Sequence, residues 1–213
     1  MLRAIRAVIH RLLPMTIPIV LASQSETRAA MLSAAGVPFE AVAARIDEDA
    51  IRAALRAEGA TPREVADALA EGKARRVSPK HPGALVIGSD QVLECEGDIF
   101  SKPDSPEAAR DQLSRLSGRR HKLISAAVIY RDGEPQWRHV DEARLTMRDL
   151  SETYIAGYVA RNWEDIRWSV GCYRIESEGI RLFSKVEGSH FTILGMPLVE
   201  LLCYLTLRGA IER

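Results

Sequence analysis

Two serines and an arginine follow the first apolar run of the chain at a spacing that suits anion binding. Residues 19–22 are apolar and few enough to form one buried strand, and Ser23, Ser25 and Arg28 come directly after it. Ser25 is a natural N-cap, and the free N–H groups of a first helical turn, two hydroxyls and a guanidinium can together bind phosphate. An ordinary capped helix after an edge strand explains the same residues, so both interpretations stay open.

Two carboxylates occupy positions where catalysis or metal binding is common. Asp90 follows the apolar run 83–88, the clearest buried strand of the sequence, and strand ends often carry catalytic groups in α/β folds. Glu48 belongs to the acidic cluster 47–49, which follows a short predicted strand. Carboxylate oxygens suit a divalent cation, whereas a solvated loop or a helix cap is the simpler explanation of the acidic cluster taken alone.

Two lysines stand out by their surroundings. Lys73 lies in the middle of the apolar stripe of a predicted helix, between Val65 and Val77. Such a lysine either extends its head to water or directs its ammonium across a cleft at an anion. Lys102 precedes Pro103, which favours an extended backbone, so its side chain is expected to leave the hairpin before it rather than pack into a helix.

These residues depend on predicted strands and helices that alternate along the chain, with no internal repeat or flexible linker. Strands are predicted at residues 19–22, 39–43, 83–88, 92–95, 99–100, 121–130, 136–147, 180–186 and 191–194. Helices are predicted to begin after Ser25, after Thr61 with a capping box, after Asp104 or Ser105, after Ser151 and near Pro197. The polar stretch 161–167 predicts a loop.

Composition narrows the class of protein. The 213 residues suffice for one domain or two closely joined lobes, and Lys plus Arg equals Asp plus Glu at 29 each. A net charge of zero argues against a bulk nucleic-acid or membrane-surface binder, and no apolar run approaches a membrane span of about 20 residues. The three cysteines have no zinc or disulfide spacing, so a reducing cytoplasm is the simplest compartment.

The first residues differ in character from the rest. Residues 1–13 carry three arginines and no acid among apolar residues, which is partly typical of a targeting segment, but no cleavage site follows. We expect residues 1–14 to be an N-terminal extension, a loosely attached helix or a stretch before an alternative start at Met15, and residues 15–213 to be a single domain.

The order and spacing of these signals resembles the Maf family of nucleoside triphosphate pyrophosphatases. The resemblance extends from about residue 17 to the last helix. It is specific at Leu-Ala-Ser-Gln-Ser (21–25), Gly-Ser-Asp-Gln (88–91), Lys-Pro (102–103), Leu-Ser-Gly (116–118) and Gly-Met-Pro-Leu (195–198). It implies an elongated α/β fold similar to that of the inosine triphosphate pyrophosphatases, with a mixed, curved sheet, flanking helices and two lobes around a deep cleft.

The resemblance also implies a reaction and the residues that perform it. The reaction is hydrolysis of a nucleoside triphosphate to the monophosphate and pyrophosphate, dependent on Mg²⁺ or Mn²⁺. Asp90 matches the family's proton acceptor and Glu48 the acid that assists the metal, so both are candidate metal ligands and catalytic residues. The phosphate-binding candidates are Lys73, Lys102, Ser23, Ser25 and Arg28.

Three positions bear on the base. Thr27, Gln91 and Glu176 stand where the family varies with its substrate, and Gln91 with Glu176 is similar to the branch that prefers 7-methyl-GTP, whereas Thr27 replaces that branch's large aromatic. A carboxylate only accepts hydrogen bonds, and the Watson–Crick edge of guanine offers two donors. Glu178 is a neighbouring candidate for the same role, and Trp168 either stacks on a base or fills a core.

The sequence therefore predicts a nucleotide pyrophosphatase with a guanine-type preference such as 7-methyl-GTP. Preference for dTTP, UTP or ITP is the alternative within the same enzyme class. A nucleotide-binding regulator of cell division with little turnover is the alternative from another class. We expect a nucleoside triphosphate substrate, no nucleic-acid or membrane partner and, by the resemblance alone, a possible homodimer.

Overall fold

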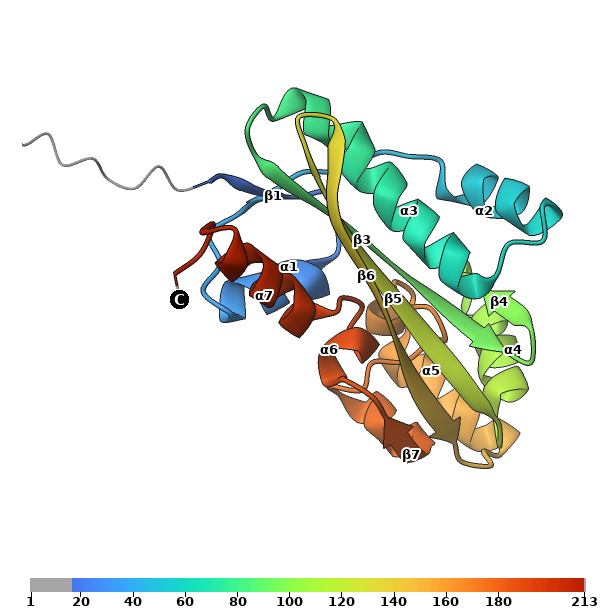
Figure 1. Ribbon diagram of the computed structural model, residues 1–213. Coiled ribbons are helices and arrows are strands. Elements are labelled where there is room, and N and C mark those ends of the chain that lie inside the picture. Colours follow the sequence, from blue (N-terminus) through green and yellow to red (C-terminus); the bar gives the residue numbers. More distant parts are fainter. Residues whose placement is uncertain (1–16, 213) are drawn as a thin grey trace, which may run out of the picture.

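A computed structural model describes residues 17–212, and one mixed seven-stranded sheet runs through them (Figure 1). The predicted extension, residues 1–14, lies outside the described residues. The strands are β1 (Ile19–Leu21), β2 (Glu40–Ala41), β3 (Leu85–Cys95), β4 (Asp98–Phe100), β5 (Arg120–Arg131), β6 (Glu134–Met147) and β7 (Phe183–Glu187). Their order in the sheet is β2-β1-β3-β5-β6-β7, and β4 pairs with β3. The predicted mixed α/β architecture is confirmed.

The short strand β1 ends beside the middle of the long strand β3. The two strands are parallel, and Leu21 lies opposite Ile87. Because β3 continues beyond that point while β1 stops, the chain that leaves β1 emerges next to residues 88–90. On its other side β3 pairs with β5 in antiparallel register, with Asp90 opposite Ala126. This topology brings residues 23–28 close to the strand that carries Asp90.

Helices cover both faces of the sheet (Figure 1). One face carries α2 (Glu48–Ala57) and α3 (Pro62–Val77). The helices on the other side are α1 (Glu26–Ala34), α4 (Pro106–Leu116), α5 (Glu152–Ile166), α6 (His190–Ile193) and α7 (Leu198–Leu207). Alternation along β5 separates the faces: Val128 packs with the α3 cluster, whereas its neighbours Ala127 and Ile129 pack with the cluster under α7.

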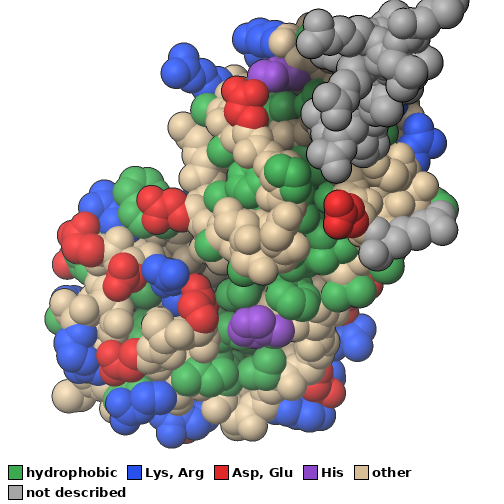
Figure 2. Space-filling model, turned by 90° about the vertical axis from the view of Figure 1, so that its left-hand side faces the viewer, with side chains coloured by type: hydrophobic (Ala, Val, Ile, Leu, Met, Phe, Trp, Pro, Cys, Tyr) green, Lys and Arg blue, Asp and Glu red, His purple; other side chains and the backbone are tan. Residues whose placement is uncertain are grey.

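The apolar core on the second face is divided in two. One cluster joins α1 and α7 to β1 and to the adjoining parts of β3 and β5, around Leu21 and Leu201. The other joins α4 and α5 to the far ends of β3, β5 and β6, around Leu113 and Tyr158. The two clusters divide this side of the sheet into two parts, and Figure 2 shows the surface drawn in between an upper and a lower part of the molecule.

Most helix starts have the predicted caps. Ser25, Ser105 and Ser151 each accept a hydrogen bond from a backbone N–H of the first turn. Thr61 and Glu64 form the complete capping box, with Pro62 at the first helical position. Local sequence therefore sets these boundaries.

The strands predicted at 83–88 and 92–95 are one continuous strand, β3, so Asp90 lies in its middle and not at a strand end.

Three other local predictions are wrong. Residues 161–166 continue α5 instead of forming a loop, because Trp163 and Ile166 pack on the α5 core and the polar residues form the solvent face. Residues 190–193 form the single-turn helix α6 instead of a strand, since a short apolar run does not distinguish the two. The strand predicted at 180–186 begins only at Phe183, after a 3₁₀ turn.

The last helix is buried on one side only. Leu198, Leu201 and Leu205 are in the core, while Val199 is 50% and Leu207 74% exposed. Within residues 17–212, the helices are too short or too polar to cross a membrane.

Helix α3 approaches β3 closely at Gly88, two residues before Asp90. A Cβ at this position would overlap the backbone carbonyl of Ala70 and lie 2.6 Å from the backbone nitrogen of Ala74, both in α3. The absence of a side chain lets α3 lie directly on β3. This contact sets the height of the α3 residue Lys73 above the strand.

We expect Gly88→Ala to lower the free energy of unfolding by about 1–3 kcal/mol, because the added methyl group must push backbone apart. Urea denaturation would measure the loss. Gly72→Ala is the matched control on α3, where a Cβ meets only the side chains of Ile46 and Ile51, at ordinary distances of 3.5 and 3.9 Å. That substitution is expected to be neutral or stabilising by up to about 1 kcal/mol. Equal stability of the Gly88→Ala variant and the parent would contradict the role of the close approach.

Candidate active site

A lysine sits between two carboxylates at the α3–β3 contact. The ammonium of Lys73 lies 2.6 Å from Oδ1 of Asp90 and 2.8 Å from Oε1 of Glu48. Lys73 is only 7% exposed, so it does not extend to water. Of its two predicted interpretations, the structure supports the ammonium directed at anions. Lys73 comes from α3, Asp90 from β3 and Glu48 from the first turn of α2, so the packing of both helices against β3 brings the three charges together.

Asp90 retains an unused hydrogen-bond acceptor. Its side chain faces α3, and its residue is 5% exposed. Oδ1 accepts from Lys73, whereas Oδ2 is buried and has no hydrogen-bond partner among the described residues. A buried acceptor without a partner costs stability. Such an atom is available to a proton, a water molecule or a cation.

Glu48 is an ionised carboxylate at the edge of the cluster. Its side chain is 37% exposed and lies in the first turn of α2, which Asp47 caps. Burial raises the pKa of Glu48, but the charges of Lys73 and Lys102 and the hydrogen bond from Lys73 outweigh burial and lower it. The acidic cluster therefore supplies one cap, Asp47, and one carboxylate directed at Lys73.

Lys102 supplies a second ammonium near the cluster. It follows β4, its side chain is exposed, and it forms no hydrogen bond or ion pair with the other residues from 17 to 212. Partial desolvation lowers its pKa, Glu48 raises it, and the positive charges of Arg28 and Lys73 lower it. Lys102 thus lies within electrostatic range of the charged residues of the cluster but forms no ion pair with the described ones.

The predicted phosphate residues of the N-terminal strand–helix turn converge as well. Ser23 is buried, and its Oγ accepts from the Ser25 backbone at 3.1 Å and from Nη1 of Arg28 at 3.5 Å. Ser25 caps α1, as the simpler interpretation held. Burial lowers the pKa of Arg28, and the charges of Asp90 and Glu48 act in the opposite direction. The guanidinium of Arg28 is therefore within electrostatic range of both carboxylates.

The predicted base-reading residues are not part of this cluster of charges. Thr27 is half-buried on α1. Gln91 uses its amide nitrogen on Ser125 and on backbone carbonyls of α6. Glu176 accepts from Nε of Arg174 at 2.9 Å.

The two other candidates for base contact also have neighbours of their own. Glu178 is bound by Arg161 and Asn162, and these hydrogen bonds lower the pKa of Glu178 to about 2. Trp168 is 68% exposed and lies against the guanidinium of Arg167, so of its two alternatives the structure excludes core filling.

Sequence reasoning missed Arg52. Its Nη2 lies 3.9 Å from Glu48 and its Nη1 2.8 Å from Asp49, while its Nε is buried without a partner among the described residues. The signal was present, because residues four apart on a helix face the same side. Arg52 adds positive charge behind the Glu48 carboxylate.

The donor set fits a divalent cation that is shared with a substrate. Within residues 17–212 no three acidic, histidine or cysteine side chains gather into a metal cluster. Mg²⁺, however, is usually bound through one or two carboxylates together with substrate phosphates and water. Glu48 and Asp90, with the free Oδ2 of Asp90, match that requirement.

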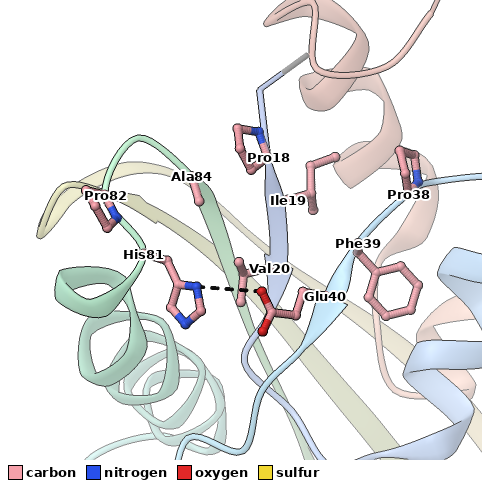
Figure 3. Close-up of a pocket in the computed structure, with 9 residues that line it drawn as sticks. All are labelled: Pro18, Ile19, Val20, Pro38, Phe39, Glu40, His81, Pro82 and Ala84. Carbon is pink, nitrogen blue, oxygen red and sulfur yellow. Dashed lines mark ion pairs between the residues drawn. The ribbon is translucent and has the colours of Figure 1, made fainter. Parts of the chain in front are cut away.

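A separate surface hollow lies away from these residues. Pro18, Phe39 and Pro82 line it, and His81 approaches Glu40 there at 3.8 Å (Figure 3). It borders the start of β3, about 20 Å of extended strand before Asp90. Its lining is largely apolar and offers no arrangement suited to hydrolysis.

Fold and site together define an α/β protein that gathers three cationic side chains and two carboxylates where a sheet strand meets a helix. Positive charge of this kind binds polyphosphates, and a carboxylate beside it can activate water. The chain belongs to the Maf family: residues 18–207 match the family model described as Maf-like protein.

Curated relatives cover almost the whole chain. A nucleoside triphosphate pyrophosphatase of Ruegeria pomeroyi is 58% identical over 93% of this chain and 100% of its own. A protein of the same name from Caulobacter vibrioides is 53% identical over 91% and 97%. A 7-methyl-GTP pyrophosphatase of Brucella abortus is 49% identical over 93% and 100%. A crystal structure of a dITP/XTP pyrophosphatase from Mycobacterium abscessus aligns with 90% of this chain and 95% of its own at 15% identity, but its TM-score of 0.40 is too low to define a shared fold.

We expect Lys73→Met to lower the free energy of unfolding by about 3 kcal/mol at pH 7.5, because it leaves the buried Asp90 without its counterion and removes one cation from Glu48. Burial raises the pKa of Glu48, and Lys73 more than offsets this, so the folded-state pKa lies below the usual 4.5. Stabilisation from Glu48 is therefore complete above about pH 4.5 and is lost as the pH falls through the folded-state value.

The stability difference between parent and Lys73→Met should accordingly shrink between pH 7.5 and pH 4, as measured by urea unfolding at both values. Lys185→Met is the control, since it removes an exposed pair with Glu187 and should cost no more than about 1 kcal/mol. A difference that is the same at both pH values would show that the loss comes from packing instead.

Proposed function

We propose that this protein is a nucleoside triphosphate pyrophosphatase that releases the monophosphate and pyrophosphate. The observation that carries the proposal is the buried, unpartnered Oδ2 of Asp90, held beside Lys73 and Glu48 with two further cations nearby. Relatives with that name that are more than 50% identical support the same activity. Binding alone would not require a desolvated carboxylate with a free acceptor.

In the proposed reaction, Asp90 accepts a proton from the water that attacks the α-phosphorus. The bond to the bridging oxygen breaks and pyrophosphate leaves with additional negative charge. Lys73 and Lys102 neutralise this charge as point cations from different elements, and Arg28 with Ser23 binds the phosphate chain from the side of α1. Because Lys73 is bound to both carboxylates, substrate phosphates would compete with them for its ammonium.

We further propose a dependence on Mg²⁺ or Mn²⁺, with Glu48 and Asp90 as the protein ligands. The free Oδ2 of Asp90 and the partly exposed Glu48 support it. When bound, such an ion would supply charge neutralisation on the phosphates. Positions 48 and 90 provide the protein's share of its ligands.

We propose a guanine-type base, with 7-methyl-GTP as the preferred substrate. Glu176 is the residue proposed to recognise the base, and Thr27 and Gln91 are the other two residues proposed for base specificity. A carboxylate can accept from both N1–H and the 2-amino group of guanine, whereas uracil offers one donor there. The 7-methyl-GTP pyrophosphatase of Brucella abortus, 49% identical, supports this choice over dTTP, UTP or ITP.

The described cysteines, all free, support a reducing cytoplasm as the proposed compartment.

A nucleotide-binding regulator of cell division with little turnover is the alternative from another class of protein. Such a regulator requires no proton acceptor, whereas the enzyme does. Substitution of the Asp90 carboxylate therefore discriminates between the two functions.

We expect Asp90→Asn to lower kcat by about 100-fold to 10,000-fold while nucleotide binding persists, because the amide keeps the shape but cannot accept the proton. Pyrophosphate release would be measured for both proteins with Mg²⁺ or Mn²⁺ over GTP, 7-methyl-GTP, UTP, dTTP, CTP and ITP. Asp98→Asn, in an exposed ion pair, is the matched control and should leave kcat unchanged.

Two outcomes would overturn parts of the proposal. Hydrolysis by Asp90→Asn at the parent rate would remove Asp90 from catalysis. Binding of nucleotides by the parent protein without turnover of any substrate in the panel would favour the regulator.

We expect Glu176→Gln to reduce the preference for 7-methyl-GTP over UTP by about tenfold, because an amide presents one acceptor where the carboxylate presents two. The ratio of kcat/KM values for the two substrates is the measurement. Glu178→Gln serves as the comparison, since Arg161 and Asn162 already occupy Glu178. If Glu178→Gln changes the ratio and Glu176→Gln does not, the base reader is Glu178.

A further inference from the structure

The single-turn helix α6 is held in place by side chains of the sheet. Backbone N–H groups of residues 194–196 bind the carbonyls of His190, Phe191 and Thr192, and side chains of the sheet add further donors at the end of the helix. Nε2 of Gln91 lies 2.9 Å from the carbonyl oxygen of Thr192 and 3.0 Å from that of Ile193. The hydroxyl of Ser125 donates to the Thr192 carbonyl at 2.7 Å. The chain after α6 therefore leaves from a fixed point on β3 and β5.

Two residues beyond α6, one carbonyl receives two side-chain donors. The hydroxyl of Ser89 donates to the Gly195 carbonyl at 3.1 Å, and Nε of Arg28 donates to the same oxygen at 2.8 Å. Ser89 is fully buried. Because side chains alternate along a strand, Ser89 and Gln91 point to the face opposite the Asp90 side chain. One strand thus holds the catalytic carboxylate on one face and fixes this carbonyl on the other.

Position 195 requires glycine for two reasons. Its φ is +106°, a conformation that side chains disfavour, and a Cβ there would lie 3.3 Å from Nη2 of Arg28. The same backbone conformation turns the carbonyl toward Ser89 and Arg28. A side chain would therefore disturb both the carbonyl and the guanidinium.

These contacts determine how Arg28 presents its guanidinium. Nε is bound by Gly195 and Nη1 reaches Ser23, whereas Nη2 forms no hydrogen bond with another residue between 17 and 212. An arginine side chain has about 2 kcal/mol of rotamer entropy to lose on binding a ligand. A guanidinium already fixed at Nε loses less of it when Nη2 binds phosphate.

We propose that Ser89 and the Gly195 carbonyl are positioning groups that hold Arg28 ready for the phosphate chain of the substrate. The inference rests on the proposed phosphate-binding role of Arg28. Ser89 acts through the carbonyl and does not touch the substrate. Gln91 contributes by fixing the segment that carries this carbonyl, which gives the glutamine beside Asp90 a function separate from base recognition.

A double-mutant cycle with Ser89→Ala and Arg28→Met tests the proposal. Binding of inorganic tripolyphosphate with Mg²⁺ is measured by calorimetry, and KM and kcat are measured with the best nucleotide of the panel. We expect Ser89→Ala to weaken tripolyphosphate binding and raise KM by about fivefold, with kcat nearly unchanged, as befits one lost hydrogen bond. In the Arg28→Met background, Ser89→Ala should change neither the affinity for tripolyphosphate nor KM.

Two further variants and two controls keep the test independent of folding. Ser89→Cys retains a weak donor and should lie between the parent and Ser89→Ala. Gly195→Ala should weaken tripolyphosphate binding at least as much as Ser89→Ala. Ser78→Ala removes an equally buried hydroxyl that accepts from the Gly133 backbone, and Gly133→Ala strains a glycine with open space around it. Both controls should leave binding unchanged.

The results separate this inference from the proposed function. Equal effects of Ser89→Ala with and without Arg28, or failure of the parent to bind tripolyphosphate, would overturn the positioning role. If the effects of Ser89→Ala and Arg28→Met on tripolyphosphate binding are not additive and the parent hydrolyses no nucleotide, the positioning role is supported and the pyrophosphatase activity is overturned. If the parent hydrolyses nucleotides and the two effects are additive, the pyrophosphatase activity is supported and the positioning role is overturned.

Discussion

The ion triad of Lys73, Asp90 and Glu48 is the interaction on which the rest of the structure depends. Lys73 and Asp90 are buried, and buried charges are tolerated only when they compensate one another. Compensation requires α3 to lie directly on β3, which Gly88 permits, and α2 to fold back so that Glu48 reaches Lys73. The packing of two helices on one strand is thus dictated by the site they enclose.

Alternation along β3 lets one short segment serve two purposes. Asp90 faces the cluster of charges, while Ser89 and Gln91 face α6 and the turn at Gly195. Arg28 connects the two faces, because it donates a hydrogen bond to the Gly195 carbonyl, while burial lowers its pKa and the charges of Asp90 and Glu48 act to raise it. The proposed proton acceptor and the proposed phosphate-binding arginine are therefore connected through the two faces of residues 89–91.

Sequence reasoning succeeded where the signal is local and failed where it is not. The caps at Ser25, Thr61 and Ser151 set helix starts through hydrogen bonds within a few residues, so they could be predicted. The helix at 190–193 was not predicted, and the carbonyls of Thr192 and Ile193 at its end are bound by Gln91 and Ser125, which lie about a hundred and about seventy residues earlier. For Arg28, residue type suggested phosphate binding, but its contact with Gly195 lies 167 residues away.

By itself the sequence determined the residue types of the site, the helix caps, the apolar strands and, through five short motifs, the family to which the chain belongs. Only the tertiary structure decided that Lys73 points at two carboxylates and not at water, and that Asp90 keeps a free oxygen. It also decided that Gln91 and Ser89 hold the backbone around Gly195. The reason is physical: a side chain's direction in a buried site is set by partners from distant segments, and their charges and desolvation exist only after the chain has packed.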